Sequence, residues 1–346
     1  MGLPQLTDRE RRVLEAVIHA YVETAEPAGS RMISRRFGLG VSPATIRNTM
    51  SDLEDKGYLF HPHTSAGRVP TDMAYRVYVD SLMRLTPVDA ASTGHLLEEL
   101  STGGTAIEAI LRRAAQMLGV LTQELGVAIG PQLEQARLER LELIRLSSER
   151  VLLVLRLTGG LARNIFIEVP GEIAEQALAD VAVVLHERLV GLTLREIRTT
   201  FSERLRDTSM PSSAGELLNI FIQEGEQIFD VSMSSDAGVL LGRPSVLAEQ
   251  PEFSSGENMR KLLTLTERPE ALGNLLRQRS ATPGITITIG DEHEDPHFSD
   301  FTVVTAEYSA GPLSGVIGVI GPTRMPYEKV ISLVTHTSRL ISDLLD

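Results

Sequence analysis

The sequence predicts a multidomain α+β protein with a helical N-terminal head. Its 346 residues are enough for two or three domains, and 42% hydrophobic with 23% charged residues is typical of a folded globular chain. Apolar residues recur with helical period through the first 84 residues. After them, strand-like runs stand on both sides of a mostly helical block at about residues 194–280. That order predicts a domain inserted into an α+β domain.

Two helices open the head. Thr7 and Glu10 have the spacing of a capping box, and apolar residues then recur with helical period up to Tyr21. A segment that contains Pro and Gly ends this helix. Ile33 and Phe37 lie one turn apart and indicate a short second helix, which a glycine-containing turn follows.

A third helix and a hairpin complete the head. Ser42 is a favoured N-cap, and Pro43 fits the first helical position because the missing N–H would have no partner there. Gly57 ends the helix. Two short strand-like runs, which begin at Tyr58 and Val69, are joined by a polar turn. Two helices, a turn, a third helix and a hairpin predict a winged helix-turn-helix.

The third helix has a polar face suited to the major groove of DNA. Its apolar side carries Ile46, Met50 and Leu53. Small and polar residues share the opposite side, and these are Ala44, Arg47, Asn48 and Ser51. Arg47 can bind guanine, and Asn48 can bind adenine or a phosphate. At the helix N-terminus, Ser42 and Thr45 expose N–H groups suited to a phosphate. Phosphate contacts are predicted for Arg31, Arg35 and Arg36, and the hairpin residue Arg68 could reach either the backbone or a minor groove.

The net charge of −13 is unevenly distributed. Residues 1–84 hold 11 basic and 10 acidic side chains, whereas the remainder holds 22 basic and 36 acidic ones. A near-neutral head with a basic surface is therefore joined to an acidic body. This arrangement favours DNA binding through the head alone.

Several functions are excluded or disfavoured. The absence of Cys excludes disulfides, thiolate zinc sites and a Cys nucleophile. No signal peptide and no apolar run near the roughly 20 residues of a membrane span are present, so we expect a cytoplasmic protein without membrane contact. We find no catalytic pattern and expect no enzyme activity, cofactor or metal site. His61 and His63, and the acidic segment 291–297, could bind cations, but we interpret them as hairpin and solvated loop. The glycine-containing run 315–322 is interpreted as a buried strand.

Two segments resemble the HrcA family of heat-inducible transcription repressors. Residues 42–57, SPATIRNTMSDLEDKG, are similar to the recognition helix of that family. Residues 61–79, HPHTSAGRVPTDMAYRVYV, resemble its wing and the following helix, and HTSAGRVPT is the more specific motif. The resemblance covers the head strongly and the rest of the chain by domain order.

The resemblance implies a winged-helix head, a GAF-like domain and an inserted dimerisation domain. The implied boundaries are 1–84 for the head, 85–104 for a linker, 105–193 and 284–346 for the GAF-like domain, and 194–283 for the insertion. It further implies repression of chaperone operons by a homodimer on an inverted-repeat operator called CIRCE, release on heat stress, and support from the chaperonin GroEL. The implied groove-facing residues are Ala44, Thr45, Arg47, Asn48 and Ser51, and the implied wing residues are His63, Ser65 and Arg68.

Two other functions stay open at this point. A transcription factor could sense a small metabolite through the GAF-like body, and such a ligand would shift operator affinity or melting temperature. Alternatively, the head could bind proteins and not DNA. Salt-dependent binding to an inverted repeat separates that case from the other two.

Overall fold

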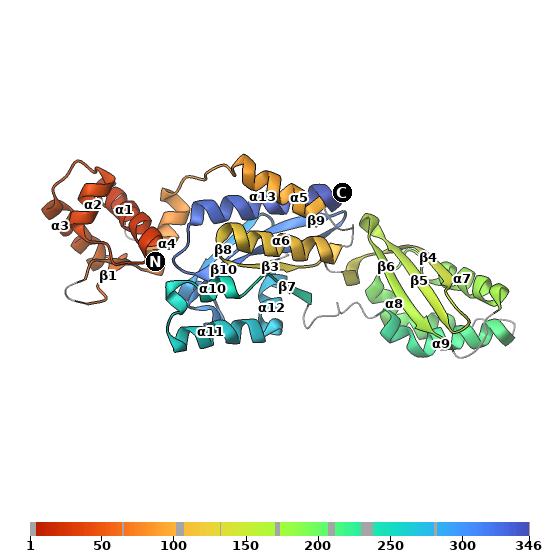
Figure 1. The fold of residues 1–346 in the computed structure, drawn as a ribbon. Coiled ribbons are helices and arrows are strands. Elements are labelled where there is room, and N and C mark those ends of the chain that lie inside the picture. Colours follow the sequence, from red (N-terminus) through yellow and green to blue (C-terminus); the bar gives the residue numbers. More distant parts are fainter. Residues whose placement is uncertain are drawn as a thin grey trace.

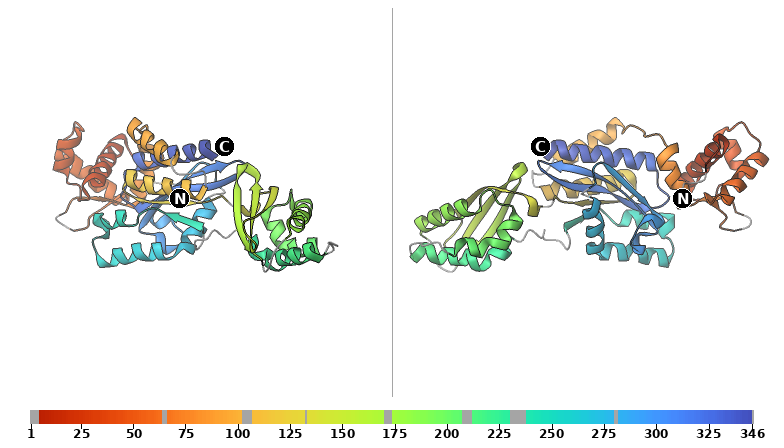
Figure 2. Two further views of the ribbon diagram at one scale, coloured as in Figure 1. Left: turned by 45° about the vertical axis from the view of Figure 1, so that its right-hand side comes forward. Right: turned by 180° about the vertical axis from the view of Figure 1, so that it is seen from behind.

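The computed structural model describes residues 5–63, 66–101, 107–131, 133–169, 174–206, 212–229, 238–279 and 282–345. The chain is elongated, with the N-terminal head at one end, a sheet with helices in the middle and a second, smaller sheet at the other end (Figures 1 and 2). The mixed α+β class predicted from the sequence is confirmed, because helices and three separate sheets are present. No helix in the described part of the chain combines the length and hydropathy needed to cross a membrane.

The head consists of three helices, a hairpin and a short fourth helix. Their bounds are α1 Asp8–Thr24, α2 Ser30–Phe37, α3 Pro43–Asp55, β1 Leu59–Phe60, β2 Val69–Pro70 and α4 Asp72–Val77, which continues as a π-helical turn over Tyr78–Leu82. The predicted capping box is present, since the Thr7 side chain accepts from the Glu10 N–H and Glu10 accepts from the Thr7 N–H. Ser42 and Thr71 cap α3 and α4 through their hydroxyl groups, which accept from the Thr45 and Ala74 N–H groups.

The expected linker at 85–104 is partly wrong. Within it, α5 spans Ala90–Ser101 and packs on α6, which spans Ile107–Thr122. Leu96 and Leu100, one turn apart, are buried in this contact, and the Asp89 carboxylate accepts from the Ser92 N–H at the start of the helix. A helix held by only two apolar positions gives too weak a periodic signal to be predicted from the sequence.

The central sheet has the strand order β7-β3-β10-β9-β8, and all its neighbouring strands are antiparallel. The strands are β3 Leu125–Ile129, β7 Val239–Leu241, β8 Ile285–Ile289, β9 Phe301–Ala310 and β10 Leu313–Pro322. The glycine-containing run 315–322 is therefore a buried strand, as predicted.

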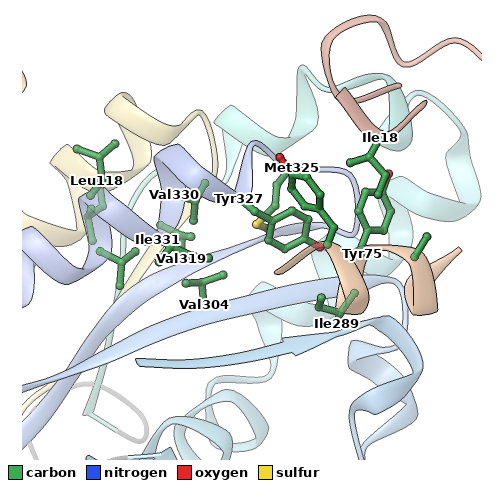
Figure 3. Close-up of a cluster of buried hydrophobic side chains, with 14 of the residues drawn as sticks. Ile18, Tyr75, Leu118, Ile289, Val304, Val319, Met325, Tyr327, Val330 and Ile331 are labelled. Atoms are coloured by element: carbon green, nitrogen blue, oxygen red, sulfur yellow. The ribbon is translucent and has the colours of Figure 1, made fainter. Parts of the chain in front are cut away.

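Helices cover both faces of this sheet. On one face lie α6 and α13 (Tyr327–Leu345), and Figure 3 shows Leu118, Val330 and Ile331 from these helices packed on Val304 and Val319 of the sheet. On the other face lie α11 (Gly256–Glu267) and α12 (Pro269–Arg279). The shorter elements of this part are α10 Ser245–Ala248 and the 3₁₀ turns Pro251–Phe253, Gly290–Glu292 and Pro296–Phe298.

The second sheet is a separate unit. It has the order β4-β5-β6, with β4 Leu138–Arg145, β5 Arg150–Leu157 and β6 Ala162–Glu168, and it packs with α7 Glu175–Leu189, α8 Leu194–Leu205 and α9 Ser212–Ile228. Two 3₁₀ turns flank its strands at Leu133–Gln135 and Thr158–Gly160. Its buried cluster includes residues from Ala136 to Phe229 and, from β10, Leu313.

This division differs from the expected boundaries at 193/194 and 283/284. Strands β4 to β6 and α7 were assigned to the main α+β domain, yet they form the second sheet and its core. Conversely, β7, α11 and α12 were assigned to the insertion but pack with the central sheet. Periodicity identifies a strand but does not reveal which distant strand it pairs with.

Candidate nucleic-acid interface

The helix α3 presents one face to the core of the head and the other to solvent. Ile46 and Leu53 are fully buried, and Met50 is 2% exposed. Together with Thr49 they pack against α1 and α2. Ala44, Arg47, Asn48 and Ser51 are exposed, and Thr45 is half-buried. The polar face predicted from the sequence is therefore exposed, and no described part of the acidic body covers it.

Local contacts fix both ends of α3. At the N-terminus, the Ser42 hydroxyl accepts from the Thr45 N–H at 3.1 Å. At the C-terminus, the Lys56 ammonium lies 2.7 Å from the Glu10 carboxylate, which joins the end of α3 to the start of α1. The hydrogen bond from Lys56 lowers the pKa of Glu10 despite its burial. These contacts hold the exposed face of α3 in a fixed orientation in the head.

Charge is unequal along the exposed face. Arg47 lies in the first half of α3, close in sequence to the basic last turn of α2 with Arg35 and Arg36. Asp52 and Asp55 are exposed in the second half. The N-terminal half of α3 is therefore the part suited to an anion, and the positive end of the helix dipole adds to this.

The hairpin is anchored to the head by its second strand. Backbone hydrogen bonds join Arg68 and Ala28 in both directions, at 2.8 and 2.9 Å. A Cβ atom at Gly67 would lie 2.4 Å from the Ala28 backbone, so only glycine allows this approach. The Arg68 guanidinium is 2.7 Å from the Glu54 carboxylate of α3, and His61 lies 3.5 Å from the same residue.

The predicted site residues fall into three groups. Exposed or half-exposed on α3 are Ser42, Ala44, Thr45, Arg47, Asn48 and Ser51. On the hairpin, His63 is exposed, but Ser65 lies outside the described residues. Arg68 is turned inward, with 14% of its side chain exposed. The sequence analysis missed the anchoring role of Glu54 and Ala28, although the glycine before Arg68 was a signal of close backbone approach.

The head also has a polar contact with the central sheet that the sequence did not reveal. Arg76 of α4 donates to the Glu292 carboxylate at 2.6 Å and to the Ile287 carbonyl at 2.8 Å. Arg324 donates to the Glu252 carboxylate at 2.9 Å and to the Val22 carbonyl at 2.6 Å. The acidic segment expected to be a solvated loop thus supplies a carboxylate to the head. Among the described residues, no cluster of His, Asp and Glu is arranged to hold a metal ion.

Comparison with known proteins places the chain in a family. Residues 108–331 match the model of the HrcA protein C-terminal domain. The chain is 40% identical over 355 residues to the heat-inducible transcription repressor HrcA of Chlorobium phaeobacteroides, with 100% of both chains covered. It is 35% identical to that of Geobacter sulfurreducens, with 99% of both covered. A solved structure described as a hypothetical protein has a TM-score of 0.71 at 21% identity, covers 99% of both chains and supports the fold. The chain therefore belongs to the HrcA family of heat-inducible transcription repressors, which are not enzymes.

Proposed function

We propose that the protein represses chaperone and chaperonin operons by binding the inverted-repeat CIRCE operator as a homodimer, and that heat stress releases it. The single observation that carries this proposal is the polar face of α3, on which Arg47 and Asn48 are exposed while the apolar side is buried. A winged helix-turn-helix head uses this helix to read base edges in the major groove. Its target is chromosomal, so we place the protein in the cytoplasm.

Within the head we assign three roles. Arg47 and Asn48 contact bases, and the small residues Ala44 and Ser51 allow close approach of the helix. Ser42 and Thr45 lie at the helix start, where the positive end of the helix dipole and their hydroxyl groups suit a phosphate. On the wing, His63 and Ser65 contact the DNA backbone. Arg68 belongs to the same hairpin, and its ion pair with Glu54 sets the angle between the wing and the helix α3.

We propose that the central sheet with its helices is the GAF-like domain, and that the unit of β4 to β6 and α7 to α9 is the inserted dimerisation domain. One face of the second sheet packs on its helices. The opposite face has an apolar line across all three strands, because Ile144 pairs with Leu152 and Leu152 pairs with Phe166. Phe166 is 69% exposed and Ile144 is 43% exposed.

A second copy of the chain is the occupant that fits this face. Arg150 and Glu168 lie 3.2 Å apart at its border, and Arg140 and Glu142 lie 2.8 Å apart. A border that carries both signs of charge around an apolar centre is self-complementary under a two-fold axis. Two heads related by that axis would match the two halves of an inverted repeat.

The heat response rests on the supply of chaperonin. We propose that GroEL supports the DNA-binding form, and that heat diverts GroEL to other unfolded proteins. Depletion of GroEL at constant temperature should then raise expression of a reporter under the operator. Unchanged repression after depletion would exclude this part of the proposal.

The direct test is a binding titration. The purified protein is titrated onto a fluorescent duplex that carries the inverted repeat from upstream of the host chaperonin genes, and onto a duplex with one half-site scrambled. We expect tight, salt-dependent binding to the first duplex and a loss of about 10³-fold or more on non-specific DNA. Equal affinity for both duplexes and for random DNA would contradict the proposal.

A further inference from the structure

A groove of about 400 Å³ lies between the helix α11 and the turn Pro296–Phe298. It is on the side of the central sheet that carries α11 and α12, opposite to α13 (Figure 1). Its volume falls within the range of about 300–1,000 Å³ that is typical of small-molecule sites. The lining residues that the structure describes lie between positions 257 and 300, so the groove belongs to the body and not to the head.

The floor of the groove is apolar. Leu265 and Phe298, which are 5% and 3% exposed, line it together with Ala271 and Pro296. The lining residues of α11 recur with helical spacing over positions 257–268, so the groove follows one face of this helix for roughly 16 Å. A ligand that fills this space must therefore be elongated and mostly apolar.

The groove is more positive than the rest of the body. Its lining side chains include three cations against two carboxylates, which leaves a net charge of +1, and these are Arg260, Lys261, Arg268, Glu257 and Asp300. The chain after residue 84 holds 22 basic and 36 acidic side chains in total. A net positive groove in an acidic body favours an anion as the ligand.

The excess positive charge belongs to Arg268. The Lys261 ammonium lies 2.7 Å from the Asp300 carboxylate, so this pair is neutral. Glu257 precedes Arg260 by three positions on the same helix, a spacing at which two side chains are neighbours. Arg268 lies at the other end of the groove and forms no ion pair with a carboxylate in the described ranges of the chain. An anion would therefore bind at the Arg268 end.

The Arg268 guanidinium is held in place by its neighbours. Its Nη1 atom lies 3.0 Å from Nε2 of His297, and Nδ1 of His297 lies 2.7 Å from the Asp295 carboxylate. Because a guanidinium only donates, Nε2 accepts from Arg268 and Nδ1–H donates to Asp295. The hydrogen bonds from His297 lower the pKa of Asp295. Pro269 restricts the backbone of Arg268 as well, so the guanidinium is oriented in advance and its other N–H groups remain for a ligand.

The chemistry of the walls selects the class of ligand. A guanidinium binds a carboxylate through two parallel hydrogen bonds, and an apolar floor removes methylene groups from water. A second negative charge on the ligand is disfavoured, because Glu257 and Asp300 line the other part of the groove. We propose that the groove binds a linear aliphatic monocarboxylate, with its carboxylate on Arg268 and its chain over Leu265 and Phe298.

The binding of a carboxylate does not rest on the proposed function. It is therefore tested on the full-length protein without DNA, by calorimetric titration with octanoate at constant ionic strength and below the concentration at which octanoate forms micelles. Octanol and octylammonium carry the same chain without the carboxylate and serve as matched probes. We expect saturable binding of one octanoate per chain, and binding of the two other probes that is weaker by about tenfold or more.

Three variants locate the ligand. Arg268→Gln removes the guanidinium and should weaken octanoate binding about tenfold or more. Ala271→Leu places a larger side chain in the apolar floor and should also weaken binding, although leucine is well tolerated in a helix. Arg188→Gln removes an exposed charge from α7, outside the groove, and should leave the affinity unchanged. Thermal unfolding of each variant establishes that it is folded.

Four results would overturn the inference: no saturable binding, octanol bound as tightly as octanoate, equal affinity in the wild type and Arg268→Gln, or an equal loss in Arg188→Gln. Unchanged affinity in Ala271→Leu would refute the position of the chain in the groove. If octanoate binds as expected while the protein ignores operator DNA, the site stands and the proposed function fails.

Discussion

Removal of the Arg47 side chain tests the assignment of the recognition face most directly. Arg47 is exposed on α3 and forms no ion pair with the residues that the structure describes. The variant Arg47→Ala should therefore change the free energy of unfolding by no more than about 0.5 kcal/mol. Its effect on DNA binding should be far larger.

The magnitude follows from the proposed dimer. One bidentate contact between arginine and guanine contributes about 1–3 kcal/mol, and two heads carry two such contacts. The expected loss is therefore about 2–6 kcal/mol for the inverted repeat, which corresponds to at least about 30-fold in affinity. A duplex with one intact half-site should lose about half of this free energy.

The assay is fluorescence anisotropy at fixed salt, with thermal unfolding measured on the same samples. Arg188→Ala, which removes an exposed arginine from α7 far from the head, is the matched control and should bind as the wild type does. If Arg47→Ala and Asn48→Ala both bind the operator with an affinity within about threefold of the wild type, α3 does not contact the bases. An equal loss in Arg188→Ala would show that only net charge matters.

Four further substitutions test the packing, the dimer and the buried titratable groups. Ile46→Ala, at a fully buried position of α3, should lower the free energy of unfolding by about 2–5 kcal/mol in urea titrations, and a smaller loss would indicate a looser head core. Phe166→Glu should convert the proposed dimer to a monomer in sedimentation velocity, and a dimer that persists in this variant would exclude this face as the interface. Burial raises the pKa of Glu124 well above that of free glutamate, so folding takes up a proton above about pH 4.5. Glu124→Gln should therefore raise the free energy of unfolding at pH 8, and this increase should disappear toward pH 4. An increase that does not depend on pH would contradict the raised pKa. Burial lowers the pKa of His293 from 6.5 to about 4. The wild type should therefore lose up to about 3 kcal/mol of its free energy of unfolding as the pH falls from 6.5 to about 4. In acid unfolding titrations, His293→Gln should lose less.

The elements of the head were predictable because their signals are local. The capping box of Thr7 and Glu10, the N-cap Ser42 and the alternation of faces on α3 each involve residues within a few positions of one another. The sequence therefore predicted both the helices and the side of α3 that is exposed. The strand-like runs on both sides of the helical block also correspond to strands of the structure.

Long-range pairing was not predictable from the same signals. Strand β3 pairs with β7 and β10, which follow it by more than a hundred residues, and nothing in the local pattern of β4 shows that it avoids this sheet. The inward turn of Arg68 depends on Glu54, because an arginine on a hairpin is as compatible with solvent as with an ion pair. Tertiary packing, and not local periodicity, determines which strands pair and which way such a side chain points.

The contacts of Arg324 and Glu292 with the head have a consequence for protein synthesis. During translation the N-terminal residues leave the ribosome long before the segments that they contact in the folded protein, since Arg324 and Val22 are separated by 302 positions. The helices of the head can form first, but its buried cluster continues into the central sheet and α13, so the packing of the head is complete only when the last strands have formed. A nascent or C-terminally truncated chain would therefore carry the head without the contacts that fix it, and only a finished chain can control where that head points.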